Sequence, residues 1–176
     1  MSPSPRPPSL PSGRTDLVTE RLVLRTWTDG EVAAVLGGER RAHWADDFPA
    51  EGDRVIAGHI AEHPGQSGAY GQRQVVERES GLVVGAVGLF WPPSEGTVEF
   101  GYGIVASRRG LGYATEAARA IAAHALTAPG VHTVYANVEL SNPASARVLE
   151  KAGLRYWGGD ATMACYRLTR TAQRGR

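Results

Sequence analysis

The chain of 176 residues carries 19 lysines and arginines against 18 aspartates and glutamates, a formal net charge of +1. This balance, without a long run of one charge sign, argues against a nucleic-acid partner and against an anionic membrane surface. Cys165 is the only cysteine. An intramolecular disulfide and cysteine-based zinc sites are therefore excluded, and a reducing cytoplasmic location is expected.

The length fits one domain that buries about two thirds of the surface of its unfolded chain. Residues 1–15 are rich in proline and serine, and we expect them to form a disordered tail rather than a secretory signal. Residues 16–170 are expected to form the single domain, and residues 171–176 a flexible C-terminus. We expect no membrane span, because no apolar run is long enough.

The first predicted elements are a strand and two helices. "RLVLRTW" (21–27) alternates apolar and polar residues like a half-buried strand. "TDGEVAAVLG" (28–37) predicts a helix capped by Thr28 or Asp29. A second helix is predicted over residues 52–63. Its apolar side would comprise Val55, Ile56 and Ile60, with His59 as a further candidate.

The middle of the chain changes to the two-residue period of strands. Three runs, residues 70–78, 81–91 and 96–106, are rich in β-branched and aromatic residues. They are joined by "ESG" and "PPSEG", which are typical turn sequences. An antiparallel meander is the simplest arrangement of three such strands.

The last third alternates helices and strands again. Apolar residues spaced by threes and fours predict a helix after Gly112, followed by a strand over residues 131–140. Residues 141–153 predict another helix, with Asn142 at its cap, and residues 162–169 a final strand. The order is that of an α+β protein with one strand–helix–strand unit.

That unit contains "SRRGLGYATEAARA" (107–120), in which two glycines and two arginines precede a helix. A helix N-terminus offers unpaired N–H groups and the positive end of the helix dipole, and glycines let an anion approach the backbone closely. The stretch therefore favours a phosphate site. The alternative is a glycine-rich turn with solvated arginines, since the pattern is neither a P-loop nor a dinucleotide fingerprint.

Arg109 to Ala114 resembles the pyrophosphate signature Q/R-x-x-G-x-G/A of the GNAT superfamily of N-acyltransferases. "TERLVLR" (19–25), "EFGYGIVASRRGLGYATEA" (99–117) and "NPASARVLEKAGL" (142–154) look like its RimJ/RimL-type branch, in the same order. The resemblance implies the GNAT fold, a mixed, mostly antiparallel sheet with flanking helices, splayed open where acyl-CoA binds.

The resemblance also implies which residues contact the cofactor, acetyl-CoA. The pantetheine arm would follow the strand from Phe100 to Val105, where Gly101 and Gly103 independently indicate a close backbone approach. The expected cofactor contacts are Ile104, Val105, Arg108, Arg109, Gly110, Leu111, Gly112, Tyr113, Ala114, Thr115, Asn142 and Ser145.

Transfer of an acyl group to an amine requires a base for the amine and a proton for the departing thiolate. Glu99 occupies a position similar to the catalytic glutamate of many family members; alternatively, it pairs with an arginine across the strands. The tyrosine that many members carry on the late helix is replaced by Leu149, so Ser145 is the candidate acid or thiol-orienting group. Asn142 would contact pantetheine, or act only as a cap.

The segment "HWADDFPAEGD" (43–53) combines aromatic and acidic residues suited to an amine on a partly apolar body. We expect Trp44, Asp46 and Asp47, together with Tyr102, to contact the acceptor. The alternative is a solvated acidic loop whose two aromatic residues are buried in the core.

The predicted function is acetyl-CoA-dependent N-acetyltransfer to a primary amine, either a protein N-terminus or a small molecule, by direct attack in a ternary complex. Two alternatives remain. One is a non-catalytic acyl-CoA sensor; the other is a zinc hydrolase, since His59 to His63 has the H-x-x-E-H spacing. Pro64 directly after that motif argues against zinc, and we expect no metal. The protein is expected to be a monomer or a homodimer.

Overall fold

One mixed sheet runs through the part of the chain that the structure, a computed structural model, describes: residues 16–66 and 68–170. The predicted tail (1–15) and C-terminus (171–176) lie outside the described residues. The strands are β1 (Leu17–Val18), β2 (Leu22–Thr26), β3 (Gln72–Glu77), β4 (Val83–Ser94), β5 (Thr97–Ile104), β6 (Thr133–Glu139), β7 (Arg155–Gly159) and β8 (Met163–Thr169). The helices are α1 (Asp29–Gly37), α2 (Glu51–Glu62), α3 (Tyr113–Ala125) and α4 (Pro143–Lys151), with short 3-10 turns η1 (Pro64–Gln66) and η2 (Ala106–Arg108).

The strand order is β1-β2-β3-β4-β5-β6-β8-β7, and every pairing is antiparallel except β5 with β6. The predicted meander is β3-β4-β5, and the predicted strand–helix–strand unit is β5-α3-β6. Its crossover helix makes the parallel pairing possible. Two short strands, β1 and β7, were not predicted, because each has only a few residues of clear pattern.

The sheet opens between β5 and β6. These strands pair only at Thr97 with Thr133, Val98 with Val134, and Glu99 with Tyr135. Beyond Glu99, β5 continues to Ile104 and β6 to Glu139 without a mutual register. The splayed sheet of the GNAT fold is therefore confirmed.

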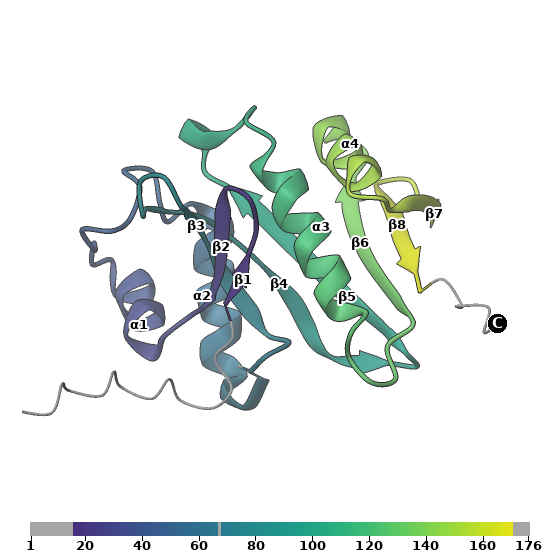
Figure 1. Cartoon of the computed structure of the whole chain (residues 1–176), viewed down its shortest axis with the longest axis horizontal. Helices are drawn as coiled ribbons and strands as arrows, with labels where there is room; N and C mark the ends of the chain where they lie inside the picture. Colours follow the sequence, from purple (N-terminus) through teal and green to yellow (C-terminus); the bar gives the residue numbers. More distant parts are fainter. Residues whose placement is uncertain (1–15, 67, 171–176) are drawn as a thin grey trace, which may run out of the picture.

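Helices α3 and α4 lie across one face of the sheet, while α1 and α2 lie near β2 and β3 (Figure 1). The buried side chains of β5, including Val98 and Phe100, pack on the same face as α3. Side chains alternate along a strand, so Glu99 points to the opposite face. The buried apolar side chains of β5 and the carboxylate of Glu99 therefore lie on opposite faces of the sheet.

Local sequence accounts for the helix starts. Thr28 Oγ1 accepts a hydrogen bond from the amide of Glu31, as predicted for a cap. In α2 the predicted apolar side needs correction, because Val55 is 66% exposed and Asp53 is buried. The Asp53 carboxylate accepts a hydrogen bond from the Ala50 amide at 2.8 Å, so this buried side chain caps the start of α2. Among the described residues, no helix is both long enough and apolar enough to cross a membrane.

Candidate active site

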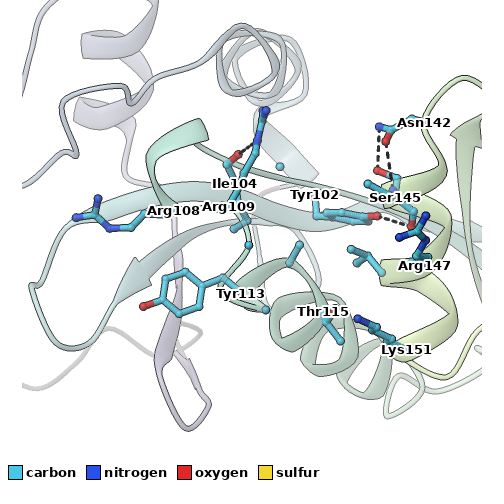
Figure 2. Close-up of a pocket in the computed structure, with 16 residues that line it drawn as sticks. Tyr102, Ile104, Arg108, Arg109, Tyr113, Thr115, Asn142, Ser145, Arg147 and Lys151 are labelled. Carbon is cyan, nitrogen blue, oxygen red and sulfur yellow. Dashed lines mark hydrogen bonds between the residues drawn. The ribbon is translucent and has the colours of Figure 1, made fainter.

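A groove of about 590 Å³ runs between β5, the start of α3 and α4 (Figure 2). Its lining includes all the expected cofactor contacts except Val105 and Leu111. Val105 is buried and donates its amide to Val84, while the Leu111 side chain is 48% exposed outside the groove. The groove is lined by Tyr102, Gly103, Ile104, Arg108, Arg109, Gly110, Gly112, Tyr113, Ala114, Thr115, Asn142, Ala144, Ser145, Arg147, Val148 and Lys151.

The turn before α3 presents backbone amides to this groove. Gly110 and Gly112 have φ angles of 78° and 83°, in the left-handed region that favours glycine. The first helical hydrogen bond of α3 runs from the Glu116 amide to Gly112. Within the described residues, the amides from Gly110 to Thr115 have no acceptor. Such a row of free N–H groups at a helix N-terminus fits an anion.

The two arginines of the turn differ in their contacts. Arg108 Nε lies 3.0 Å from Glu77 Oε2, which also accepts from the Tyr113 hydroxyl at 2.8 Å. Arg109 Nε donates to the Ile104 carbonyl at 3.2 Å (Figure 2), and no carboxylate of the described residues lies within 4 Å of its guanidinium. Arg109 is therefore the arginine whose charge is available to an anion.

Glu77 is a buried residue of β3 that contacts the turn before α3. Burial by itself would raise the pKa of this carboxyl, but hydrogen bonds from Ser80, Tyr113 and Arg108 outweigh burial and hold the pKa below its ordinary value. An ionised Glu77 thus ties β3 to both ends of the turn. Sequence analysis missed this residue, since its partners are distant in sequence.

Two further residues brace the turn from outside. Arg21 donates to the Leu111 carbonyl at 2.6 Å and pairs with Glu116 at 2.9 Å. Asp47 accepts from the amide and the hydroxyl of Ser107, both at 2.8 Å. These hydrogen bonds hold the pKa of Asp47 below its ordinary value, first of all the one from the Ser107 amide. Asp47, predicted as an acceptor contact, thus supports the turn on the donor side.

The opposite wall of the groove is the first half of α4. Asn142 Oδ1 accepts from the Ser145 amide at 3.2 Å, and Asn142 Nδ2 donates to Ser145 Oγ at 3.1 Å. Asn142 is therefore a helix cap that also lines the groove. The Tyr102 hydroxyl donates to the Ser145 carbonyl at 3.2 Å and so bridges β5 and α4 across the opening (Figure 2). Burial raises the pKa of Tyr102, although this hydrogen bond acts in the other direction.

Two cations on α4, Arg147 and Lys151, line the groove and were missed by sequence analysis. Their spacing of four residues places them on one side of the helix, which is the only sequence signal that could have found them. Leu149, at the place of the family's tyrosine, is fully buried in the core.

Glu99 does not line the groove; it stands at the last paired position of β5 and β6, on the other face of the sheet. Its carboxylate lies 3.5 Å from Asn137 Nδ2. After burial, the charge of Glu99 is the next cause that raises the pKa values of the Tyr135 hydroxyl and the Cys165 thiol. The split therefore separates a carboxylate on one face from the anion-binding turn on the other.

The segment predicted to contact the acceptor is largely structural. Trp44 is 3% exposed and packs on Phe48, with ring centroids 5.3 Å apart. The indole is thus in the core, not in a cleft, which corrects the prediction. Asp46 is exposed. Burial raises the pKa of Asp53 to about 6, although its bond from Ala50 acts against this.

The histidines of the H-x-x-E-H motif stack on each other. The His59 and His63 rings are 4.3 Å apart, and His63 Nδ1 contacts the His59 carbonyl at 2.9 Å. Within residues 16–66 and 68–170, no group of three histidine, cysteine, aspartate or glutamate side chains is placed to hold a metal ion.

The chain and its fold match a known family. Residues 21–155 match the acetyltransferase (GNAT) domain, and the chain belongs to that family. The protein is an acyltransferase of the kind that uses acetyl-CoA as co-substrate.

Solved structures share the fold at low sequence identity. A GNAT-family acetyltransferase from Bacillus anthracis is 21% identical with a TM-score of 0.65, covering 88% of this chain and 98% of its own. A Bordetella pertussis protein described as a GNAT-family acetyltransferase is 24% identical, with a TM-score of 0.65 and coverage of 90% and 100%. A Vibrio cholerae protein described as a ribosomal-protein-serine acetyltransferase is 18% identical, with a TM-score of 0.62 and coverage of 88% and 97%.

Proposed function

We propose that the protein transfers the acetyl group of acetyl-CoA to a primary amine by direct attack in a ternary complex. The observation that carries this proposal is the split between β5 and β6. The groove with the free amides opens on one face, and Glu99 stands at the end of the split on the other. A donor and an acceptor could therefore meet from opposite sides of one sheet.

On the donor side, acetyl-CoA supplies the activated acyl group. The amides from Gly110 to Thr115, with the charge of Arg109, suit its pyrophosphate. Arg147 and Lys151 add positive charge along the α4 wall. The β5 backbone from Tyr102 to Ile104 borders the same groove and suits the pantetheine arm. We infer that Thr115, Ala114 and Ile104 complete this cofactor site.

On the acceptor side, Glu99 is the proposed base. An alkylamine with a pKa near 10 is mostly protonated at neutral pH and must lose a proton before it attacks. Glu99 would accept that proton directly or through water. The departing thiolate is a tolerable leaving group, and the hydroxyls of Ser145 and Tyr102 face the groove to orient it.

The order of the three motifs, together with the likeness to the Vibrio cholerae protein described above, supports the RimJ/RimL-type branch as the finer assignment. The acceptor would then be either a protein N-terminus or a small-molecule amine. The absence of the family's tyrosine, with Leu149 in its place, keeps a non-catalytic acyl-CoA sensor as the second candidate.

The test measures CoA release from acetyl-CoA with a panel of amines, and CoA binding by calorimetry. We expect turnover, and Glu99→Gln to lower it roughly 100-fold while the Kd for CoA stays within about threefold. Glu62→Gln, an exposed change at the end of α2, is the matched control. Tight CoA binding without turnover for any amine would favour the sensor, and an unchanged pH–rate profile in Glu99→Gln would remove Glu99 as the base.

A further inference from the structure

A row of three charged side chains and one tyrosine crosses the face of the sheet opposite to α3 and α4. Glu99 on β5 pairs with Tyr135 on β6, Tyr135 pairs with Arg167 on β8, and Arg167 pairs with Arg155 on β7. Directly paired residues project from the same face of a sheet. The four positions therefore form one row, with a carboxylate at one end and two guanidinium groups at the other.

This face is open to solvent at its basic end. Arg155 and Arg167 are exposed, and Trp157 is 61% exposed. The neighbouring residues of β6 and β8, such as Ala136 and Tyr166, are buried on the other face. Because α4 packs on that other face (Figure 1), it leaves the row uncovered.

Arg155 and Arg167 lie directly opposite each other on β7 and β8. Like charges directly opposite each other on neighbouring strands destabilise a sheet, yet no carboxylate of the described residues lies within 4 Å of either guanidinium. The Arg167 guanidinium instead lies over the Trp157 ring, 4.5 Å from its centroid. This stacking holds one cation in place and leaves its edge free for a planar or tetrahedral anion.

Glu99, at the acidic end of the row, has no cationic partner among the described residues. The hydrogen bond that Glu99 accepts, from Asn137, is long at 3.5 Å, and no arginine, lysine or histidine among the described residues lies within 4 Å of its carboxylate. Two strand spacings separate Glu99 from Arg167, about 10 Å between their Cα atoms. The row thus offers a cation site and an anion site at the distance of a short molecule.

We propose that the acceptor is a small primary amine that also carries a carboxylate or phosphate, with Arg167 and Arg155 binding the anion while Glu99 receives the amine. This inference rests on the proposed function and names its substrate class. It moves acceptor recognition from the acidic segment 43–53 to the sheet face. Tyr135, between the two ends, borders the chain that joins the amine to the anion.

The experiment compares four amines as acceptors: 6-aminohexanoate, 5-aminopentyl phosphate, hexylamine and 1,5-diaminopentane. We expect at least one of the two anionic amines to have a kcat/KM about tenfold or more above hexylamine, and which one is preferred identifies the anion. Equal or better use of hexylamine or the diamine would overturn the inference while leaving the acetyltransferase intact. Acetylation of a peptide with an acidic second residue, but of neither anionic amine, would overturn the small-molecule acceptor.

Variants test the anion site itself. Arg167→Ala should raise the KM for the anionic amine about tenfold, through loss of a charge-assisted contact, and leave the KM for hexylamine within about twofold. Arg167→Lys should recover part of the loss. Arg54→Ala, an exposed change on α2, is the control and should change neither KM. An equal rise for both amines, or no rise, would refute the assignment.

Two readouts do not depend on turnover. Calorimetric binding of the anionic amine should weaken in Arg167→Ala, whereas the Kd for CoA should not change. The thermal midpoint should also hold, because the substitution removes the repulsion from Arg155 as well as the contact with Trp157. Failure of the four amines and of the peptide to react, with CoA still bound, would refute the proposed function. Undiminished amine binding in Arg167→Ala would refute only the anion site.

Discussion

Replacing Arg109 and Arg108 with alanine, one at a time, should separate cofactor binding from folding in the turn before α3. Because no carboxylate in the described part of the chain pairs with Arg109, its removal should cost one charge-assisted contact with the pyrophosphate, about 1.5–3 kcal/mol. This corresponds to a roughly 10- to 150-fold higher Kd for CoA. The free energy of unfolding should fall by less than about 1 kcal/mol, since only the bond to Ile104 is lost.

Arg108→Ala should show the opposite pattern. The side chains of Arg108 and Glu77 are 26% and 8% exposed, so the substitution leaves a mostly buried carboxylate without its cation. Glu77 keeps its bonds from Ser80 and Tyr113. The expected loss of unfolding free energy is therefore about 1.5–3 kcal/mol, below the 3–5 kcal/mol typical of a fully buried pair. The Kd for CoA should change less than about threefold.

The assays are calorimetric titration with CoA and urea unfolding, carried out on both variants and the wild type. The reasoning predicts a crossed result, in which each variant affects one measurement much more than the other. Equal losses of CoA affinity with unchanged stability in both variants would show that Arg108 is also free to bind the cofactor. That outcome would refute the division of roles between the two arginines.

Three further predictions concern the surroundings of the turn. The pKa of Glu77 lies below its ordinary value of 4.5. The stabilisation that ionised Glu77 provides is therefore complete above that value and is lost as the pH falls through the folded-state pKa. Urea unfolding between pH 3 and 5 should show a steeper loss of unfolding free energy in the wild type than in Glu77→Gln. Gly112→Val should lower the free energy of unfolding by at least about 1–2 kcal/mol and weaken CoA binding, because φ at Gly112 is 83°. Gly103→Ala should fold normally, because the added Cβ would meet open space. Equal melting temperatures of the two variants would contradict this reasoning. Asp47→Asn should weaken CoA binding severalfold by loosening Ser107 without changing the KM of the acceptor, and Asp46→Asn should change neither; an altered acceptor KM would restore these aspartates to the acceptor site.

Features that depend on residues close together in the chain could be predicted from the sequence. The caps at Thr28 and Asn142, the antiparallel meander and the turn around Gly110 and Gly112 all follow from local spacing and conformational preference. The GNAT fold, by contrast, was implied by a resemblance carried by three ordered motifs. The local features could be predicted because each cap, turn or strand pattern is formed by residues close together in the chain.

The roles of the charged residues in these motifs depend on contacts made in the folded protein. Arg108 and Arg109 are neighbours with the same chemistry, and they differ because Glu77, some thirty residues earlier, lies beneath only one of them. Asp47 is an acceptor contact by composition and a brace by position. Burial and distant hydrogen bonds, which no local pattern encodes, set these roles.

The row from Glu99 to Arg155 is the clearest case. Its members are spread over more than fifty residues of sequence and become neighbours only through the register of four strands. If the register of any of these strands shifted by one residue, its member of the row would point to the opposite face of the sheet. Because register depends on packing along the whole sheet, the sequence could supply a candidate base at Glu99, and only the folded sheet could place two arginines in line with it.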